Sequence, residues 1–583
     1  DGGPVVRLPF SWTGIELNQA GAVQARVRIS PAGEFAVQVD VAGSDGGLIA
    51  RVHRLAVRPV DQAQLEAAGR AGARSLFSVG WRPVATGESA GPATIAVLGD
   101  SAVPGDSVAG PAERYADLAA LERAVAGGSP VPEAVLAVIG APAPAGGDAD
   151  AAVGVAGETL GLVQGWLSSE ALAGCTLVVA TRRGVAVGDE APDVAAAAAW
   201  GLVRSAQSEH PDRFVLVDLD DSAGPDWAVL AALAEPQLAV RGGQLLAPRL
   251  ERAEITATPG QETWRLETGA VLITGGTGGL GALVARHLAA GGARHLVLVS
   301  RRGLNAEGAG ELAAELEAGG CQVRVAACDV GDRGQLAGLL GSLEYPLTAV
   351  VHAAGVLDDG VVSSLTGAQL DRVMRPKAGG ALLLDELTAG LDLAGFVLFS
   401  SAAGLMGSPG QGNYAAANAV LDALAARRRA AGQAGVSLAW GLWEQETGMT
   451  GVLDQADLAR LARAGIRPLP ASQGLDLFDE ARLGDGALMV PVRLDLAALA
   501  ARARAGTLPS LLRGLVRSAA RRAAASTGSL AQRLAAVPEA EREHLTLNLV
   551  QARVAAVLGY SSGDAIDPGR AFKDLGFDSL AAV

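Results

Sequence analysis

The chain has 583 residues, and a prior of about 150 residues per domain predicts roughly four domains. Half of the residues (50%) are hydrophobic and 19% are charged, which excludes an intrinsically disordered chain. The formal net charge of −15 disfavours nucleic acid and acidic membrane surfaces as partners. The longest apolar run, 194–203, falls well short of the ~20 residues of a membrane span, so no membrane span is expected. No secretory leader is visible, and we expect a cytoplasmic location.

Cysteine and lysine are both rare. Cys175, Cys321 and Cys328 form no CxxC pair and no metal-ligand set, so a reducing environment and no metal are expected. The basic residues are otherwise arginines, and the chain contains two lysines, Lys377 and Lys573. This distribution could arise by chance, or at least one of the two positions could require an ammonium group.

The first elements in chain order alternate between strand-like and helical patterns. Residues 1–60 alternate apolar and polar side chains, which predicts a small antiparallel sheet. From about 75 to 255, strand-like runs alternate with Ala- and Leu-rich helical runs, the βα pattern of a parallel sheet. No Gly-rich phosphate loop follows the first strand of this segment.

The βα pattern repeats more clearly between residues 268 and 497, where seven parallel strands are expected. The predicted fold class is therefore α/β, with two Rossmann-like doubly wound parallel-sheet subdomains in succession. The Ala-rich segment 499–535 with its spaced arginines is predicted to be a linker with helical pieces, and a helix is expected after residue 545. A nucleic-acid patch in the linker is disfavoured because interleaved aromatic residues are missing.

A glycine-rich turn follows the first strand of the second repeat. Gly276, Gly278 and Gly281 form GxGxxG between the strand-like run VLIT and the helical run ALVARHLAA. In this context glycines let the backbone approach a pyrophosphate, which lies at the helix N-terminus. The motif predicts dinucleotide binding, and the alternative is a turn without a ligand.

The next strand ends in Ser300, Arg301, Arg302 and a glycine. An acidic residue there would bind the ribose hydroxyl of NAD, whereas two guanidinium groups suit a 2′-phosphate, so NADPH is favoured over NADH. Asp329, after the third strand, is expected to touch the adenine. The alternative for the two arginines is a solvated pair, and the alternative for Asp329 is an ordinary turn residue.

Four residues could together catalyse the reduction of a carbonyl group by a bound hydride donor. Tyr414 and Asn418 are four apart and share a helix face, and Ser401 ends a strand at the edge where such sheets bind ligands. A phenol with a pKa of ~10 needs a nearby cation to act at neutral pH, and Lys377 is the candidate. Ser401 would bind the carbonyl oxygen, and Asn418 would position Lys377 or a relay water.

These motifs resemble the short-chain dehydrogenase/reductase superfamily, and more closely the ketoreductase domains of modular polyketide synthases. The resemblance rests on TGGTGGLG, SRRG, HAAG, FSSAAGLMGSPGQGNYAAANAVLDALA and AWGLW. In most of the superfamily a lysine lies four residues after the tyrosine, where this chain has Asn418. Lys377 instead lies 37 residues before Tyr414, the exchange that polyketide ketoreductases show.

The resemblance implies a domain order for the whole chain. Residues 1–62 resemble the end of a dehydratase hot-dog domain, 75–258 the structural subdomain and 259–498 the NADPH-binding catalytic subdomain. A linker at 499–544 and the start of an acyl carrier protein at 545–583 follow. The structural subdomain should bind no cofactor. The family further implies cofactor-binding roles for Thr274, Gly276, Thr277, Gly278, Gly279, Leu280, Gly281, Ser300, Arg301, Arg302, Asp329, Val330, Ala353, Ala354 and Gly355.

Further implications concern stereochemistry and tethering. Leu357, Asp358 and Asp359 resemble the LDD element of B-type ketoreductases, and Met406 stands where A-type members have Trp, so a D (3R) hydroxyl product is expected. The alternative is that the two aspartates only cap a turn. Ser579 in DLGFDSL resembles the attachment site of 4′-phosphopantetheine, the alternative being a simple helix N-cap.

The predicted activity is NADPH-dependent reduction of a carrier-tethered β-ketoacyl thioester. The expected partners are this acyl carrier protein-bound substrate and the other domains of the same synthase, within a homodimeric multienzyme. Three alternatives remain at this point. They are a redox-silent ketoreductase kept for scaffolding or epimerisation, a fatty-acid-type multienzyme reductase, and a non-enzymatic carrier-interaction module.

Overall fold

The protein is described from a computed structural model, and its chain forms two compact units, Asp1–Arg74 and Ser75–Val583. The described residues are 6–18, 25–33, 36–43, 47–60, 75–84, 94–99, 113–140, 147–221, 227, 235–253, 264, 266–444, 455–516, 537–558 and 566–570.

The first unit is a four-stranded antiparallel sheet in the order β1-β4-β3-β2. Ile49, Val52 and Leu55 of β4 are buried, whereas His53 and Arg54 between them are exposed. The antiparallel sheet predicted for this segment is therefore confirmed, and its hot-dog assignment stays a prediction. The strands are β1 (Val6–Leu17), β2 (Ala25–Pro31), β3 (Ala36–Gly43) and β4 (Leu48–Val60).

The seven parallel strands predicted between 268 and 497 are confirmed, in the order β15-β14-β13-β16-β17-β18-β20. The chain runs outward from β13 to β15 and then returns to β16 on the other side of β13. Sheets of this type bind ligands at the point where the strand order reverses, beyond the carboxyl ends of the strands. The strands are β13 (Ala270–Thr274), β14 (His295–Ser300), β15 (Gln322–Ala327), β16 (Leu347–His352), β17 (Gly395–Ser401), β18 (Val436–Trp440) and β20 (Leu488–Pro491).

The first βα repeat also forms a largely parallel sheet, with one correction. The last strand-like run, 237–250, was expected to be a single run of the parallel pattern, but it forms two strands, β11 and β12, that pair antiparallel. Gly242 and Gly243 join them with φ of +54° and +77°, and a two-residue link makes a tight hairpin because it is too short for a crossover. The strands are β6 (Ile95–Leu98), β7 (Glu113–Tyr115), β8 (Ala134–Val138), β9 (Thr176–Arg182), β10 (Phe214–Leu219), β11 (Gln237–Arg241) and β12 (Gln244–Arg252).

The two repeats share one 15-stranded sheet, which was not predicted from the sequence. β5 (Leu76–Pro83) connects them, because it pairs antiparallel with β20 on one side and with β12 on the other. Leu76 and Phe77 of this strand are almost completely buried. A strand from the start of the unit thus closes the gap between its two halves.

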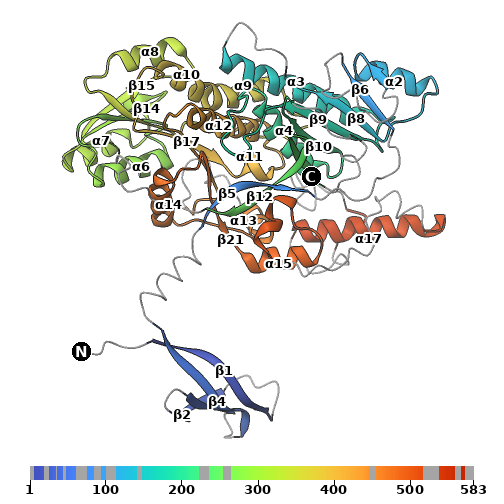
Figure 1. Cartoon of the computed structure of the whole chain (residues 1–583), viewed down its shortest axis with the longest axis vertical. Helices are drawn as coiled ribbons and strands as arrows, with labels where there is room; N and C mark the ends of the chain where they lie inside the picture. Colours follow the sequence, from blue (N-terminus) through green and yellow to red (C-terminus); the bar gives the residue numbers. More distant parts are fainter. Residues whose placement is uncertain are drawn as a thin grey trace. The chain divides into compact units, whose positions relative to one another are not determined.

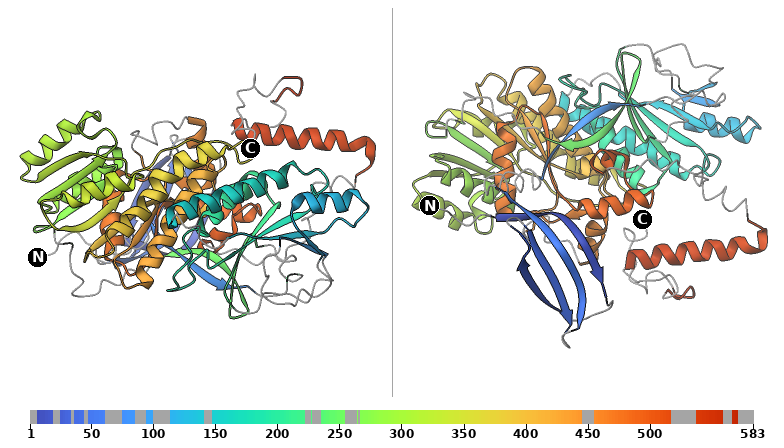
Figure 2. Two further views of the ribbon diagram at one scale, coloured as in Figure 1. Left: turned by 90° about the horizontal axis from the view of Figure 1, so that it is seen from above. Right: turned by 60° about the horizontal axis from the view of Figure 1, so that its bottom comes forward.

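Helices cover both faces of the sheet. One face carries α3 (Asp148–Ser168), α4 (Ala197–Glu209), α9 (Gly367–Met374), α10 (Gly380–Leu387) and α12 (Gly412–Ala430), which share one hydrophobic cluster. The other face of the second half carries α6 (Gly279–Ala290), α7 (Ala309–Ala318) and α14 (Ala471–Leu483). Figure 1 shows these two helical layers above and below the strands, and Figure 2 shows α3 of the first half beside the yellow helices of the second.

The beginning of the predicted linker is part of the packed unit. α15 (Leu496–Arg504) and the 3-10 helix η4 (Ser510–Leu515) bury Leu499, Leu511 and Leu512 in a cluster with β5, β12 and β20. The Ala- and Arg-rich composition concealed these spaced leucines. The expected C-terminal helix is present as α17 (Glu539–Leu558). Among the described helices, none is both long and apolar enough to cross a bilayer.

Candidate active site

The glycine-rich turn lies between β13 and α6, at the reversal of strand order. A Cβ atom on Gly281 would come within 2.2 Å of the Gly275 carbonyl oxygen, and one on Gly276 within 2.8 Å of the Ile273 carbonyl oxygen. Glycine is therefore required at both positions for the turn to close. Gly278 is the N-cap residue of α6 and has no side chain to cap it, which leaves backbone N–H groups at the helix N-terminus for a phosphate.

Thr274 and His352 connect this turn to the loop after β16. The Thr274 hydroxyl lies 2.8 Å from His352 Nδ1 and accepts a hydrogen bond from the Ala354 amide at 3.3 Å. His352 is fully buried, and its Nε2 lies 2.8 Å from the Lys377 carbonyl oxygen. Burial and the Lys377 charge lower the pKa of His352 to about 3, so its imidazole is neutral. The HAAG motif is evident in the sequence, but this positioning role of His352 was not predicted from it.

The proposed phosphate-binding arginines follow β14 beside this turn. Arg301 and Arg302 are exposed, and neither forms an ion pair with another described residue. Ser300 Oγ accepts a hydrogen bond from the Gly303 amide at 3.1 Å and shapes the bend. Asp329 follows β15 at the same sheet edge, where its carboxylate accepts a hydrogen bond from the Gly331 amide. The site therefore offers free helix N–H groups and two unpaired guanidinium groups, which fit a dinucleotide with a 2′-phosphate.

Three separate elements contribute the four catalytic candidates. Ser401 ends β17, Tyr414 and Asn418 lie in the first half of α12, and Lys377 lies in the π-helical turn η2 (Arg375–Gly379) between α9 and α10. Such π-helical turns are frequent at functional sites. Lys377 Nζ donates to the Phe399 carbonyl oxygen at 2.9 Å and lies 5.0 Å from the centre of the Tyr414 ring. The structure thus brings the lysine and the tyrosine together although 36 residues separate them in the chain.

Burial dominates the electrostatics of this pair. Desolvation lowers the pKa of Lys377 from 10.5 to about 8, against the attraction of the buried Asp422 carboxylate. Burial raises the pKa of Tyr414, and hydrogen bonding with Asn418 and Ser401 opposes this shift. The expectation of a lowered phenol pKa is wrong for the net shift, because desolvation outweighs the neighbouring groups, whereas the contribution of Lys377 itself stays a prediction. A raised pKa keeps Tyr414 protonated at neutral pH, as a proton donor requires.

The LDD loop lies against the segment that leads into α12. Asp358 accepts hydrogen bonds from Arg372 at 2.6 Å and from Gln369 at 3.3 Å, and Gln411 donates to Asp359 at 2.9 Å. The Asn413 amide donates to the Asp358 carbonyl oxygen. These bonds orient both aspartates, beyond the capping of a turn.

The remaining predicted residues have different positions. Leu357 is half-buried and packs against the hydrophobic cluster shared by α3, α4, α9, α10 and α12. Met406 ends the short helix α11 (Ala403–Met406) and packs against the cluster formed with β5, β12 and β20. Ser579 and the DLGFDSL motif lie outside the described residues. Within the residues that the structure describes, no group of three potential metal ligands occurs.

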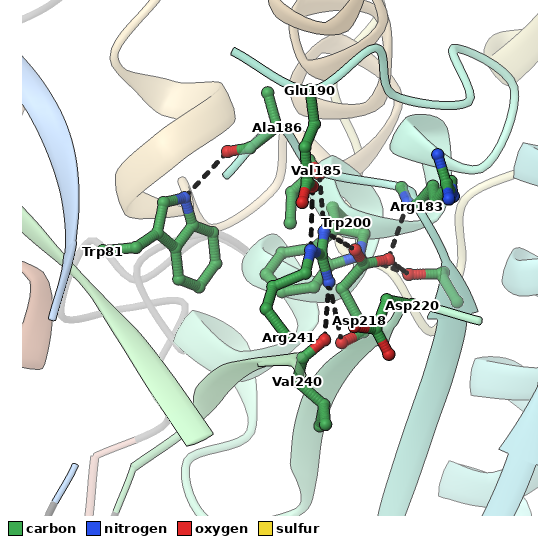
Figure 3. Close-up of polar contacts among 12 residues, drawn as sticks. Trp81, Arg183, Val185, Ala186, Glu190, Trp200, Asp218, Asp220, Val240 and Arg241 are labelled. Atoms are coloured by element: carbon green, nitrogen blue, oxygen red, sulfur yellow. Dashed lines mark hydrogen bonds and ion pairs between the residues drawn. The ribbon is translucent and has the colours of Figure 1, made fainter. Parts of the chain in front are cut away.

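The equivalent edge of the first half is filled by its own side chains (Figure 3). The fully buried Asp218 accepts hydrogen bonds from Thr181, the Gly184 amide and Arg241, and Arg241 also pairs with Glu190. Burial raises the pKa of Asp218 to about 6 against these partners. The absence of a cofactor from this half stays a prediction, and the filled edge is consistent with it.

Fold and site are of the nucleotide-binding Rossmann class, and comparisons with known proteins specify the family. A ketoreductase ("KR domain") family model matches residues 269–445, and the "Polyketide synthase extender module SpnB, Rossmann fold domain" model matches 79–250. A solved structure described as A-type ketoreductases from a modular polyketide synthase is 38% identical, with a TM-score of 0.65 over 76% of this chain and 97% of that one. A C2-type ketoreductase structure is 31% identical, with a TM-score of 0.63 over 76% and 100% of the two chains.

Longer relatives match along the whole chain. Polyketide synthase GfsA of Streptomyces halstedii is 49% identical over all of this chain and 8% of its own length. Spectinabilin polyketide synthase system protein NorA of Streptomyces orinoci is 44% identical over all of this chain and 31% of its own length. The chain therefore belongs to the modular polyketide synthases and contains their ketoreductase, an oxidoreductase. It spans less than a third of the length of these two relatives.

Proposed function

We propose that this ketoreductase reduces a carrier-tethered β-ketoacyl thioester to the D (3R) β-hydroxyacyl thioester with NADPH. The observation that carries the proposal is the buried Lys377 amine 5.0 Å from the Tyr414 ring centre, at the sheet edge that holds the glycine-rich turn. When bound, NADPH supplies the hydride that the β-carbon of the substrate accepts. All other steps belong to side chains of this chain.

Tyr414 donates its phenolic proton to the carbonyl oxygen as that oxygen gains negative charge. Ser401 aligns the same oxygen by a hydrogen bond, which stabilises its developing charge. Loss of the proton leaves a phenolate, and the adjacent Lys377 ammonium stabilises it in a low-dielectric site. Asn418 Oδ1 is buried and accepts no hydrogen bond from the described residues, so it is available for a relay water or for Lys377.

The cofactor preference rests on Arg301 and Arg302, and the stereochemistry rests on the LDD loop and Met406. The proposal also includes an acyl carrier protein with 4′-phosphopantetheine on Ser579, a dehydratase-like segment at 1–62 and membership of a homodimeric multienzyme. The complete set of Tyr414, Lys377, Ser401 and Asn418 argues against a redox-silent role.

The test is loss of NADPH absorbance on addition of a β-ketoacyl pantetheine surrogate, followed by chiral analysis of the product. Tyr414→Phe should lower kcat by roughly a hundredfold or more, because it removes the proton donor. Tyr345→Phe, at a half-buried tyrosine that bonds Gln322 far from the tetrad, is the matched control and should keep wild-type rates. Full activity of Tyr414→Phe, or equal kcat/KM with NADH, would contradict the respective part of the proposal.

A further inference from the structure

A buried carboxylate of the first half reaches two loops of the active site. Glu209 ends α4, and its side chain is almost completely enclosed, with 7% of the residue exposed. One carboxylate oxygen accepts a hydrogen bond from the Val362 amide at 2.7 Å, and the other accepts one from the Gly410 amide at 2.8 Å. Val362 lies three residues after Asp359, and Gly410 lies four residues before Tyr414.

These two loops also bond to each other. The Gly360 amide donates to the Gly410 carbonyl oxygen at 2.7 Å, and Gly360 and Gln411 form a parallel bridge. The Gln411 amide reaches the Asp359 carboxylate. Hydrogen bonds therefore join the LDD loop to the segment leading to Tyr414, and Glu209 bonds to this joined region at two points.

Two neighbouring side chains of the first half support the same region. Gln164 of α3 donates to the carbonyl oxygens of Val362 and Leu365 at 2.9 and 2.7 Å. Arg204, in α4 before Glu209, donates to the Gly404 carbonyl oxygen at 2.8 Å. Polar side chains therefore add hydrogen bonds to the apolar packing between the two subdomains.

The cost of burying a carboxylate indicates that its geometry matters. An enclosed charge is unfavourable unless it is hydrogen-bonded, and here both oxygens accept from backbone N–H groups that would otherwise lack partners. Such charge-assisted bonds fix distance and direction more strictly than apolar contacts do. A small displacement of a loop beside the reacting centre is enough to change the rate and the face of attack.

We propose that Glu209 is a positioning residue that sets the pose and the reacting face of the β-ketoacyl substrate by holding the LDD loop in register with Tyr414. This inference rests on the proposed reductase function. It assigns to the structural half a specific part in stereocontrol, exerted through loop 357–362 and loop 407–411.

The test is Glu209→Gln in the full chain, which keeps the shape but presents an NH2 group to one of the two N–H donors. We expect KM for the pantetheine surrogate and the fraction of the minor hydroxyl isomer each to rise roughly tenfold, the effect of losing one charged hydrogen bond. The Kd for NADPH should stay within about twofold of wild type, since the glycine-rich turn is untouched. Glu170→Gln, at an exposed position, makes the same charge change and should alter none of these values.

Hydrogen exchange gives a readout that does not depend on turnover. Peptides covering Val362 and Gly410 should exchange roughly tenfold faster in Glu209→Gln than in wild type, because the amides lose their acceptor. Gln164→Met removes the neighbouring donor without a change of charge, and it should shift the isomer ratio in the same direction. This second variant decides the question if Glu209→Gln fails to fold.

The outcomes separate three claims: that Glu209 holds the two loops, that it thereby controls stereochemistry, and that the chain is an NADPH-dependent reductase. Unchanged hydrogen exchange in Glu209→Gln overturns the claim that Glu209 holds the two loops, which we call the Glu209 clamp. Faster exchange with an unchanged isomer ratio overturns the role of this clamp in stereocontrol. A wild-type chain that does not oxidise NADPH overturns the proposed function and the stereochemical role together, while exchange still decides whether the clamp exists.

Discussion

Lys377 is nearly inaccessible to solvent, with 2% of the residue exposed, and its amine bonds a single carbonyl oxygen among the described residues. A buried amine loses its proton more easily than an exposed one because desolvation disfavours the charged form. The chemistry we propose needs the ammonium, since a neutral amine cannot stabilise the phenolate of Tyr414. The protonation of this single side chain should therefore limit the pH range of the reaction.

We expect kcat/KM for the surrogate to fall as the pH rises through about 8, the pKa to which burial lowers Lys377. Above that pH the rate should decrease roughly tenfold per pH unit, following the protonated fraction. Stopped-flow measurement at saturating NADPH, with the Kd for NADPH followed at each pH, checks this. A rate that stays constant well above pH 8 would contradict the role of the ammonium.

The Lys377 amine also makes stability depend on pH, and this dependence runs opposite to that of the rate. The pKa of Lys377 is lower in the folded chain (about 8) than its ordinary value of 10.5, so the unfolded chain binds more protons in this window. The Lys377 contribution to the free energy of unfolding therefore increases with pH between these values. A loss of activity above pH 8 consequently cannot be attributed to unfolding caused by this residue.

At the scale of elements, the close packing of α4 against α12 positions the tyrosine. A Cβ atom on Gly201 of α4 would lie 2.1 Å from the Ala415 carbonyl oxygen, next to Tyr414 in α12. A Cβ atom on Gly407 would lie 2.2 Å from the Arg204 carbonyl oxygen. The two helices therefore meet backbone to backbone, and any larger residue at Gly201 must separate α4 from the part of α12 that carries Tyr414.

Gly201→Ala should lower the free energy of unfolding by about 1–3 kcal/mol, the usual cost of overpacking a core, and should also lower kcat. Gly157→Ala on α3 is the matched control, because nothing lies within 4 Å of its added Cβ. It should be neutral or stabilising by about 0.5–1 kcal/mol, since alanine favours helix. Denaturant titration followed by tryptophan fluorescence measures both, and equal stabilities would contradict the close helix contact.

At the scale of the whole molecule, β5 determines where the reductase unit begins. It is hydrogen-bonded on both sides within the 15-stranded sheet, and it buries Leu76 and Phe77. Residues 1–74 form a separate compact unit. The boundary of the reductase should therefore lie immediately before β5.

A chain that begins at Ser75 should keep the NADPH oxidation rate of the full chain. A chain that begins at residue 85, ten residues later, should fail to fold, because loss of β5 leaves β20 and β12 unpaired and opens the core. Circular dichroism and turnover of the two chains, compared with the full chain, measure the difference. Normal folding of the shorter chain would show that the continuous sheet is dispensable.

Local patterns in the sequence determined much of this protein. Alternation of apolar and polar residues predicted the antiparallel sheet at the start, because burial of one strand face imposes a period of two. Continuous apolar runs between helical runs predicted the seven parallel strands, because both faces of such strands are buried. The glycine spacing at 276–281 predicted the turn, since only glycine avoids the backbone collisions found there. Ser401, Tyr414 and Asn418 were proposed from their places at a strand end and on a helix face, and Lys377 was proposed as the cation that a phenol requires.

Interactions between distant segments were decided only by the tertiary structure. The strand β5 joining the two halves and the burial of η4 depend on contacts between distant segments that no local pattern encodes. His352 and Glu209 escaped notice because their roles come from partners 25 or more residues away. The pKa of Tyr414 was predicted with the wrong sign, because desolvation depends on how completely the folded chain encloses a group and this is a property of the packed molecule.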